Sequence, residues 1–181
     1  MALLEILTWP DKRLAAKSTN VDQVDDEIRK LIDDMFETMY FAEGVGLAAP
    51  QVGVTKRIIV VDCGVRESEE SSPLTAKEPL AIINPEVTIQ DGKIAWEEGC
   101  LSVPGYTEEV ERSAKVTVTG LDREGKPITI EAEGLLSVCL QHEIDHLEGV
   151  LFVDRLSRLK QEMAKKKLRK QMEEEARDRA V

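Results

Sequence analysis

The two histidines of this 181-residue chain lie four residues apart, in the run Gln141-His142-Glu143-Ile144-Asp145-His146. Two histidines placed at random in the chain would have this spacing about once in ninety arrangements. Residues i and i+4 of a helix project from one face, so both imidazoles could bind a single metal ion. The glutamate beside the first histidine could then move protons for a water molecule that the ion makes acidic. The alternative is a pair of ordinary histidines on the surface of an amphipathic helix.

The helix that must position this motif, predicted over residues 135–148, is apolar around most of its circumference. One face carries both histidines together with Leu135 and either Val138 or Cys139, and a second stripe consists of Leu136, Leu140, Ile144 and Leu147. A helix of this kind is buried at the centre of a protein. An unpaired polar group in such a place costs several kcal/mol, so the histidines need partners. This argues against the surface alternative.

A catalytic metal site needs a third protein ligand and one open position. Phe152 stands where a longer form of the motif has a third histidine, and it cannot bind a metal. Glu162, the ligand that a thermolysin-like endopeptidase would use, lies in a lysine-rich stretch typical of a solvated helix. Cys63 and Cys139 are typical of small core residues. Cys100 lies in a polar, glycine-containing segment, so a His₂Cys site with one open position is favoured.

Charge and cysteine content restrict the class of protein. The net charge of −11 argues against general nucleic-acid binding, and no apolar run has the length of a membrane span. The first residues lack the basic segment and cleavage site of a signal peptide. Three cysteines are an odd and sparse set, which fits a reducing compartment better than a disulfide framework. We therefore expect a cytoplasmic protein.

Local patterns predict an α+β fold. They indicate a helix over residues 25–42 that ends before Gly44, and a buried strand over 57–62. Strands are predicted over 80–84 and 86–90, with a hairpin turn at Asp91-Gly92 leading into 93–96, and a further hairpin is predicted from 115–121 and 127–132. Residues 64–79 have the composition of an exposed acidic loop. We expect largely antiparallel sheets packed around the central buried HExxH helix, with an N-terminal and a C-terminal helix.

The last 22 residues differ in charge from the rest of the chain. Residues 160–181 contain eight lysines or arginines and five acids, giving +3 against −14 for residues 1–159. The segment has no glycine or proline and is rich in helix-forming residues. We predict a single catalytic domain over 1–159 and a charged helical extension over 160–181. Such a charge run is usually a solvated helix face, and the alternative is docking on an acidic partner.

At this point the chain resembles the peptide deformylases, which remove the formyl group from the N-terminal methionine of new bacterial polypeptides. Three motifs, taken together, carry the resemblance: Gly44-Val45-Gly46-Leu47-Ala48-Ala49-Pro50-Gln51, Glu98-Gly99-Cys100-Leu101-Ser102 and the HExxH run. The resemblance implies that Cys100, His142 and His146 bind the metal and that Glu143 is the general acid/base. It also implies Fe²⁺ as the natural ion, with Zn²⁺ or Ni²⁺ able to occupy the same site.

The resemblance also assigns contacts to the substrate, an N-formyl-methionyl peptide. The side-chain amide of Gln51 and the backbone N–H of Leu101 would stabilise the oxyanion. Val45, Gly46 and Leu47 could pair with an extended peptide as an added strand, and Val45 and Val138 are candidates for the walls of the methionine site.

One position departs from the pattern of some bacterial members. They have an arginine directed toward the bound peptide where this chain has Thr107. Its absence leaves open the contacts made beyond the first residue of the substrate. Arg112 is expected to pair with nearby acids rather than to replace that arginine.

Three functions remain to be distinguished: a deformylating metallohydrolase, an HExxH endopeptidase that needs Glu162, and a non-catalytic structural zinc module. Replacing Glu143 separates the first from the third, because only a hydrolase would lose turnover while keeping its metal. For the basic residues 165–170 we predict docking near the ribosome exit, where the substrate emerges.

Overall fold

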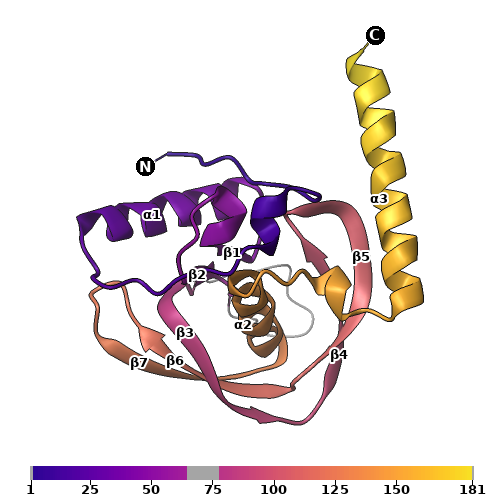
Figure 1. The fold of residues 1–181 in the computed structure, drawn as a ribbon. Helices are drawn as coiled ribbons and strands as arrows, with labels where there is room; N and C mark the ends of the chain where they lie inside the picture. The colour runs from indigo at the N-terminus through magenta and orange to yellow at the C-terminus, as the bar shows by residue number, and fades with distance from the viewer. Residues whose placement is uncertain (1, 65–77, 181) are drawn as a thin grey trace.

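The computed structural model describes residues 2–64 and 78–180 (Figure 1). Most of the predicted acidic loop therefore lies outside the described residues. The helices in the described part are α1 (Asp26–Phe41), α2 (Gly134–Leu147) and α3 (Arg158–Arg179). The strands there are β1 (Gly46–Ala48), β2 (Ile58–Val61), β3 (Leu80–Asp91), β4 (Ile94–Cys100), β5 (Val103–Arg112), β6 (Lys115–Leu121) and β7 (Pro127–Glu133).

The strands of the described residues form two antiparallel sheets. One has the order β1-β2-β3-β6-β7, and the other consists of β4 and β5. This confirms the predicted α+β class with largely antiparallel sheets, and the hairpin of β6 and β7 is also confirmed. The four residues of β2 are all buried, as expected for its continuous apolar run.

The hairpin predicted at Asp91-Gly92 is wrong. The chain does turn there, with Gly92 at a φ of 67°. However, β3 pairs with β6 while β4 pairs with β5, so the chain passes from one sheet to the other at this turn. Turn chemistry determines where a chain bends, but the pairing partner depends on which distant strands share a buried face.

Helix α1 covers the first sheet beside β1 and β2. The Asp25 side chain accepts a hydrogen bond from the Ile28 backbone N–H at 3.0 Å, which caps the N-terminus. Its buried side chains include Ile28, Ile32, Met35 and Met39, at helical spacing. After the helix, the N–H of Gly44 donates to the Met39 carbonyl at 2.9 Å, as the predicted stop requires.

Helix α2 lies in the middle of the molecule, enclosed by strands (Figure 1). It contacts β1, β2 and β7, and Leu140 and Leu147 are fully buried in the core. The helix is therefore buried, as its apolar circumference predicted. This position places the HExxH residues between the five-stranded sheet and the strands β4 and β5.

Helix α3 runs along one side of the molecule (Figure 1). It contacts β5, and Ala164 and Leu168 form its buried contacts among otherwise exposed or half-buried residues. Helix α3 begins at Arg158 and therefore continues without a break across the predicted domain boundary between residues 159 and 160. The division of the chain into two parts at that boundary stays a prediction. Among the described residues, no helix has the length and apolar character needed to cross a membrane.

Candidate metal centre and active-site cavity

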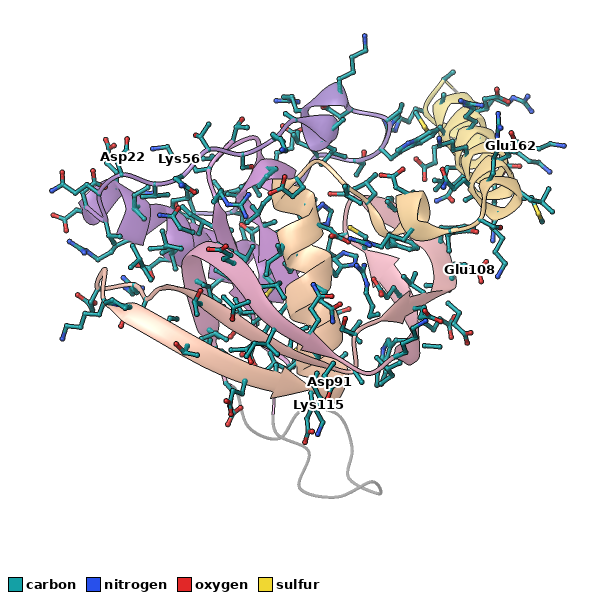
Figure 2. The ribbon with its side chains drawn as sticks, turned by 60° about the horizontal axis from the view of Figure 1, so that its bottom comes forward. Asp22, Lys56, Asp91, Glu108, Lys115 and Glu162 are labelled. Carbon is teal, nitrogen blue, oxygen red and sulfur yellow. The ribbon has the colours of Figure 1, made fainter. Side chains whose placement is uncertain are left out.

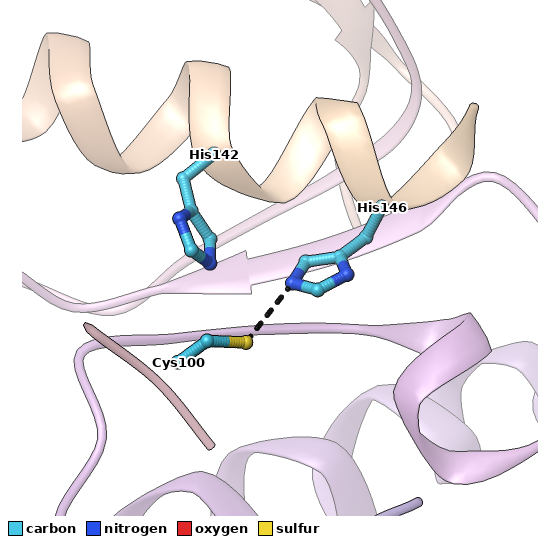
Figure 3. Close-up of side chains that lie close together, drawn as sticks. All are labelled: Cys100, His142 and His146. Atoms are coloured by element: carbon cyan, nitrogen blue, oxygen red, sulfur yellow. Dashed lines mark hydrogen bonds between the residues drawn. The ribbon is translucent and has the colours of Figure 1, made fainter. Parts of the chain in front are cut away.

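Cys100, His142 and His146 lie together in the fold. Cys100 ends β4, the histidines are one turn apart on α2, and one ligand atom from each residue lies within 4.8 Å of the others. Figure 3 shows the Cys100 Sγ facing His146 Nε2, at 3.4 Å. Bonds of about 2.0–2.3 Å to one tetrahedral ion would place such atoms about 3.3–3.6 Å apart. The three residues therefore have the chemistry and the spacing to hold one ion.

His142 is oriented by Glu98, a residue to which the sequence interpretation gave no role. The Nδ1–H of His142 donates to Glu98 Oε1 at 2.8 Å, which leaves Nε2 for the metal. Arg112 donates two hydrogen bonds of 2.8 Å to the same carboxylate. Burial opposes ionisation of Glu98, but the hydrogen bonds from Arg112 and His142 outweigh it and hold the pKa of Glu98 below its usual value.

Arg112 extends this network to Asp145, three residues after His142 on α2. It donates to Asp145 Oδ2 at 2.5 Å, and Arg155 binds both oxygens of Asp145 at 2.6 Å. The expectation that Arg112 pairs with nearby acids is thus confirmed. A signal for Glu98 was present in the sequence, because residues 98 and 100 of a strand point to the same side.

Glu143 faces a cavity of about 440 Å³ that is also lined by Cys100 and His142. The residue is 5% exposed, and among the described residues its Oε2 has no hydrogen-bond partner. A Cβ at Gly46 would lie 2.5 Å from Glu143 Oε1, so a glycine is needed for this approach. Burial raises the pKa of Glu143 to about 7, a value suited to a general base near neutral pH.

The side chain of Gln51 is held with its amide nitrogen toward Cys100. Its Oε1 accepts from the Ala48 N–H at 2.9 Å, while its Nε2 donates to Ser102 Oγ at 3.0 Å and lies 3.5 Å from Cys100 Sγ. Leu101 lines the cavity and packs against Gly44. The N–H of Ser102 donates to Cys100 Sγ at 3.4 Å.

The predicted substrate residues differ in where their side chains lie. Val45, Gly46 and Val138 line the cavity. The side chain of Leu47 is fully buried in the core cluster with α1, because alternate residues of a strand point to opposite faces. Leu47 therefore offers only its main chain to a ligand.

Phe152 and Glu162, which the sequence analysis rejected as third metal ligands, lie in different environments. Phe152 is 1% exposed, and its ring stacks on His142 with centroids 6.0 Å apart. Glu162 lies on the solvent side of α3 (Figure 2), where its exposed carboxylate is 3.9 Å from Arg158. Phe152 thus packs against one of the two histidines of the motif.

The site combines a buried helix that carries two histidines, a strand cysteine beside them and a buried glutamate that faces a cavity. These features define a metal-dependent hydrolase of the HExxH type. The sequence profile described as "Polypeptide deformylase" matches residues 3–162. The chain belongs to the peptide deformylase family. It is thus a metal-dependent enzyme that removes the formyl group from the N-terminal methionine of newly made polypeptides.

Individual relatives agree with the profile. The chain is 53% identical to a peptide deformylase of Alkalilimnicola ehrlichii over 170 residues, covering 94% of this chain and 91% of that protein. It resembles the crystal structure of peptide deformylase from Ehrlichia chaffeensis with a TM-score of 0.88 and 44% identity, covering 97% of this chain and 99% of that one. A structure of the Ehrlichia enzyme in complex with actinonin matches with a TM-score of 0.85 and 48% identity, covering 94% and 98% of the two chains.

Proposed function

We propose that Cys100, His142 and His146 hold the metal and that Glu143 is the general acid/base of the deformylation reaction. The observation that carries this proposal is the convergence of the three ligand atoms beside a cavity lined by the buried Glu143. Its Oε2 has no hydrogen-bond partner among the described residues. A divalent ion in this site would supply a water molecule activated near neutral pH.

Each residue around the cavity then has a distinct task. Glu143 takes a proton from the attacking water and passes it to the leaving amine. The Nε2 of Gln51 and the backbone N–H of Leu101 donate to the oxygen on which negative charge develops. Loss of one such donor typically costs about 3–4 kcal/mol of barrier reduction. Glu98 acts on His142, holding its ring so that Nε2 faces the site.

The peptide is proposed to bind in extended form along β1. In the described part of the chain β1 is an edge strand with β2 on one side, so its other side can accept a peptide strand. Gly46 and the main chain of Leu47 would form this pairing, and Val45 and Val138 would contact the methionine side chain. Actinonin occupies a matching Ehrlichia structure, which makes it a suitable competitor for binding measurements.

Fe²⁺ is the proposed ion in the cell, with Zn²⁺ or Ni²⁺ able to occupy the same ligands. A site of one thiolate and two imidazoles accepts all three ions. Formate release from a formyl-Met peptide, measured with anaerobic Fe²⁺ and with Zn²⁺ beside metal analysis, ranks them. Equal turnover with both ions would contradict the choice of Fe²⁺.

Glu143→Gln is the test of the catalytic assignment. We expect formate release to fall by at least a hundredfold while one equivalent of metal stays bound, because the ligands are unchanged. Glu131→Gln, an exposed residue outside the cavity, is the matched control and should keep full activity. Full activity in Glu143→Gln would contradict the mechanism. Loss of activity in Glu162→Gln, with cleavage of internal peptide bonds, would favour the endopeptidase instead.

The basic part of α3 is proposed to dock the enzyme on the ribosome in the cytoplasm. Lys166 and Lys170 are exposed, two positions along the helix from the buried Ala164 and Leu168, and so face away from the protein. Reversing both lysines to glutamate should abolish co-sedimentation with ribosomes at low salt. The exposed Lys12→Glu, remote in sequence from α3, is the control. Unchanged binding of the lysine variant, or binding insensitive to salt, would contradict this proposal.

A further inference from the structure

Cys63 and Cys139 have no part in the proposed metal centre. Cys63 follows β2, and Cys139 lies on α2 in a distant part of the sequence. Both belong to the same apolar cluster, at the place where α2 packs against β2. Their thiols form a side-chain hydrogen bond with each other. The fold therefore brings two free thiols from distant parts of the chain into contact.

Cys100, the third cysteine, makes a different set of contacts. Its Sγ lies 3.4 Å from His146 Nε2 and 3.5 Å from the amide nitrogen of Gln51. These partners belong to the metal centre and the proposed oxyanion site. The sulfur of Cys100 is therefore assigned to the ion, and the thiol that Cys139 contacts is that of Cys63.

The two thiols of the pair differ in exposure and in acidity. Cys63 is half-buried, whereas Cys139 is only 7% exposed. The hydrogen bond from Cys139 lowers the pKa of Cys63, although burial and the charges of Asp62 and Glu143 oppose this change. The same hydrogen bond, together with burial, raises the pKa of Cys139. A partly exposed thiol with a lowered pKa and a second thiol beside it has the features of a peroxide-sensitive cysteine.

Cys139 connects this pair to the active-site cavity. It lines the cavity together with Val138, the proposed contact of the substrate methionine, and it lies less than one helical turn before His142. The described residues that line the cavity do not include Cys63. A reaction that begins at Cys63 therefore reaches the cavity wall through Cys139.

We propose that Cys63 and Cys139 form a reversible disulfide on exposure to peroxide, and that this bridge weakens binding of the substrate methionine. The second part rests on the proposed binding mode, in which Val138 contacts that side chain. In a disulfide the two sulfurs lie about 2.05 Å apart, much closer than two thiols in a hydrogen bond. Closing the bridge draws Cys139 toward Cys63 and shifts the part of the cavity wall that adjoins Val138.

The oxidation proceeds in two balanced steps. The thiolate of Cys63 attacks one peroxide oxygen, so that an S–O bond forms, the O–O bond breaks, and the departing hydroxide takes up the thiol proton as water. The sulfur of Cys139 then attacks the sulfenic acid, so that the S–S bond forms as the S–O bond breaks, and the second hydroxide takes up the Cys139 proton. Together the two thiols lose two electrons, and the peroxide is reduced to water. Dithiothreitol reverses the oxidation by thiol–disulfide exchange.

The first test treats the zinc-loaded enzyme with a small excess of hydrogen peroxide, because Zn²⁺ itself has no redox chemistry. The intact mass should fall by about 2 Da as both thiols are lost, and peptide mapping should find residues 63 and 139 linked. Dithiothreitol should restore both thiols. Absence of the bridge, or a bridge that includes Cys100, would overturn the proposal.

Two variants separate the roles of the thiols. Cys63→Ser should keep the Cys139 thiol under the same treatment, because the reactive partner is missing. Cys139→Ser should stop at the sulfenic acid of Cys63, which dimedone traps as an adduct. Loss of the Cys139 thiol from Cys63→Ser at the wild-type rate would overturn the assignment of Cys63 as the first site of attack.

A binding measurement tests the effect on the cavity without turnover. Formyl-Met-Ala-Ser is titrated by calorimetry onto zinc-loaded Glu143→Gln, before and after oxidation. Affinity should fall about fivefold or more, because shifting the wall of a packed site is costly, and dithiothreitol should restore it. The double variant Cys63→Ser/Glu143→Gln should bind equally before and after the treatment.

The outcomes distinguish this inference from the catalytic proposal. Equal affinity of the bridged and reduced forms would overturn the proposed control of the methionine site. The bridge itself is measured by mass and does not depend on the role of Glu143. Failure of the reduced wild type to release formate would therefore contradict the catalytic assignment alone.

Discussion

The buried guanidinium of Arg112 gives the sharpest test of how helix α2 is held beside β4 and β5. Its side chain is 2% exposed, and it pairs with Glu98 and Asp145, whose side chains are 4% and 12% exposed. Arg112→Met replaces the charged side chain with an apolar one of similar length and removes three hydrogen bonds to carboxylates. Breaking a buried pair by removing one partner typically costs about 3–5 kcal/mol, because the other charge stays buried.

The structure places the expected loss at the lower end of that range. Asp145 keeps two hydrogen bonds from Arg155, so the cost falls mainly on Glu98. We expect a loss of about 3 kcal/mol in the free energy of unfolding. With a urea m-value of about 2 kcal/mol/M, the unfolding midpoint should fall by about 1.5 M. The measurement is made on metal-free protein, so that binding of the ion does not add to either stability.

A matched control and a double-mutant cycle test the reasoning. Arg158→Met breaks an exposed pair with Glu162 at 3.9 Å and should change stability by less than about 0.5 kcal/mol. Adding Glu98→Gln to Arg112→Met should cost less than the sum of the two changes, because the carboxylate no longer needs neutralising. A loss below about 1 kcal/mol in Arg112→Met, or strict additivity in the cycle, would refute the assignment of a buried ionic network.

Three further changes test the core and one ion pair between the exposed Lys30 and the buried Asp34. Gly120→Ala should lower the free energy of unfolding by about 1–3 kcal/mol in urea titrations, since its Cβ would lie 2.8 Å from the Ile83 carbonyl oxygen. Leu140→Ala should cost about 2–5 kcal/mol in the same assay, because the side chain is fully buried; a loss below about 1 kcal/mol would contradict this. The hydrogen bond from Lys30 lowers the pKa of Asp34, so its carboxylate stabilises the fold above pH 4 and loses that effect as the pH falls through the lowered pKa. Asp34→Asn should therefore destabilise the metal-free protein at pH 7 and progressively less below about pH 4 in urea titrations; a constant difference would contradict this sign.

Local sequence was sufficient for the elements that carry the chemistry. The spacing of His142 and His146 and the apolar positions around them predicted α2, because helix periodicity is set by neighbouring residues. The apolar spacing that begins at Ile28 likewise predicted α1. Cys100 was selected by the polarity of its own segment, and the structure brings it to the histidines.

Features that depend on distant partners could not be predicted in this way. The turn at Gly92 was found, but the pairing of β3 with β6 depends on strands more than 20 residues away. The contacts of Arg112 with Glu98 and Asp145 likewise join residues 14 and 33 positions apart. The direction of the Leu47 side chain was likewise not predicted, because strand alternation directs it into the core only in the register that β1 has with β2.

The position of β1 at the end of its sheet has a consequence for self-association. An open strand edge is a template on which any extended chain, including another copy of the protein, can add. In this fold that edge consists of three residues, Gly46–Ala48, set beside the cavity rather than along an outer face. Main-chain pairing over so short a length does not depend on the side chains of the incoming strand. Under the proposed binding mode, this edge therefore accepts the N-terminal residues of many different polypeptides. Because the edge is so short and lies beside the cavity, it also keeps copies of the enzyme from polymerising through it.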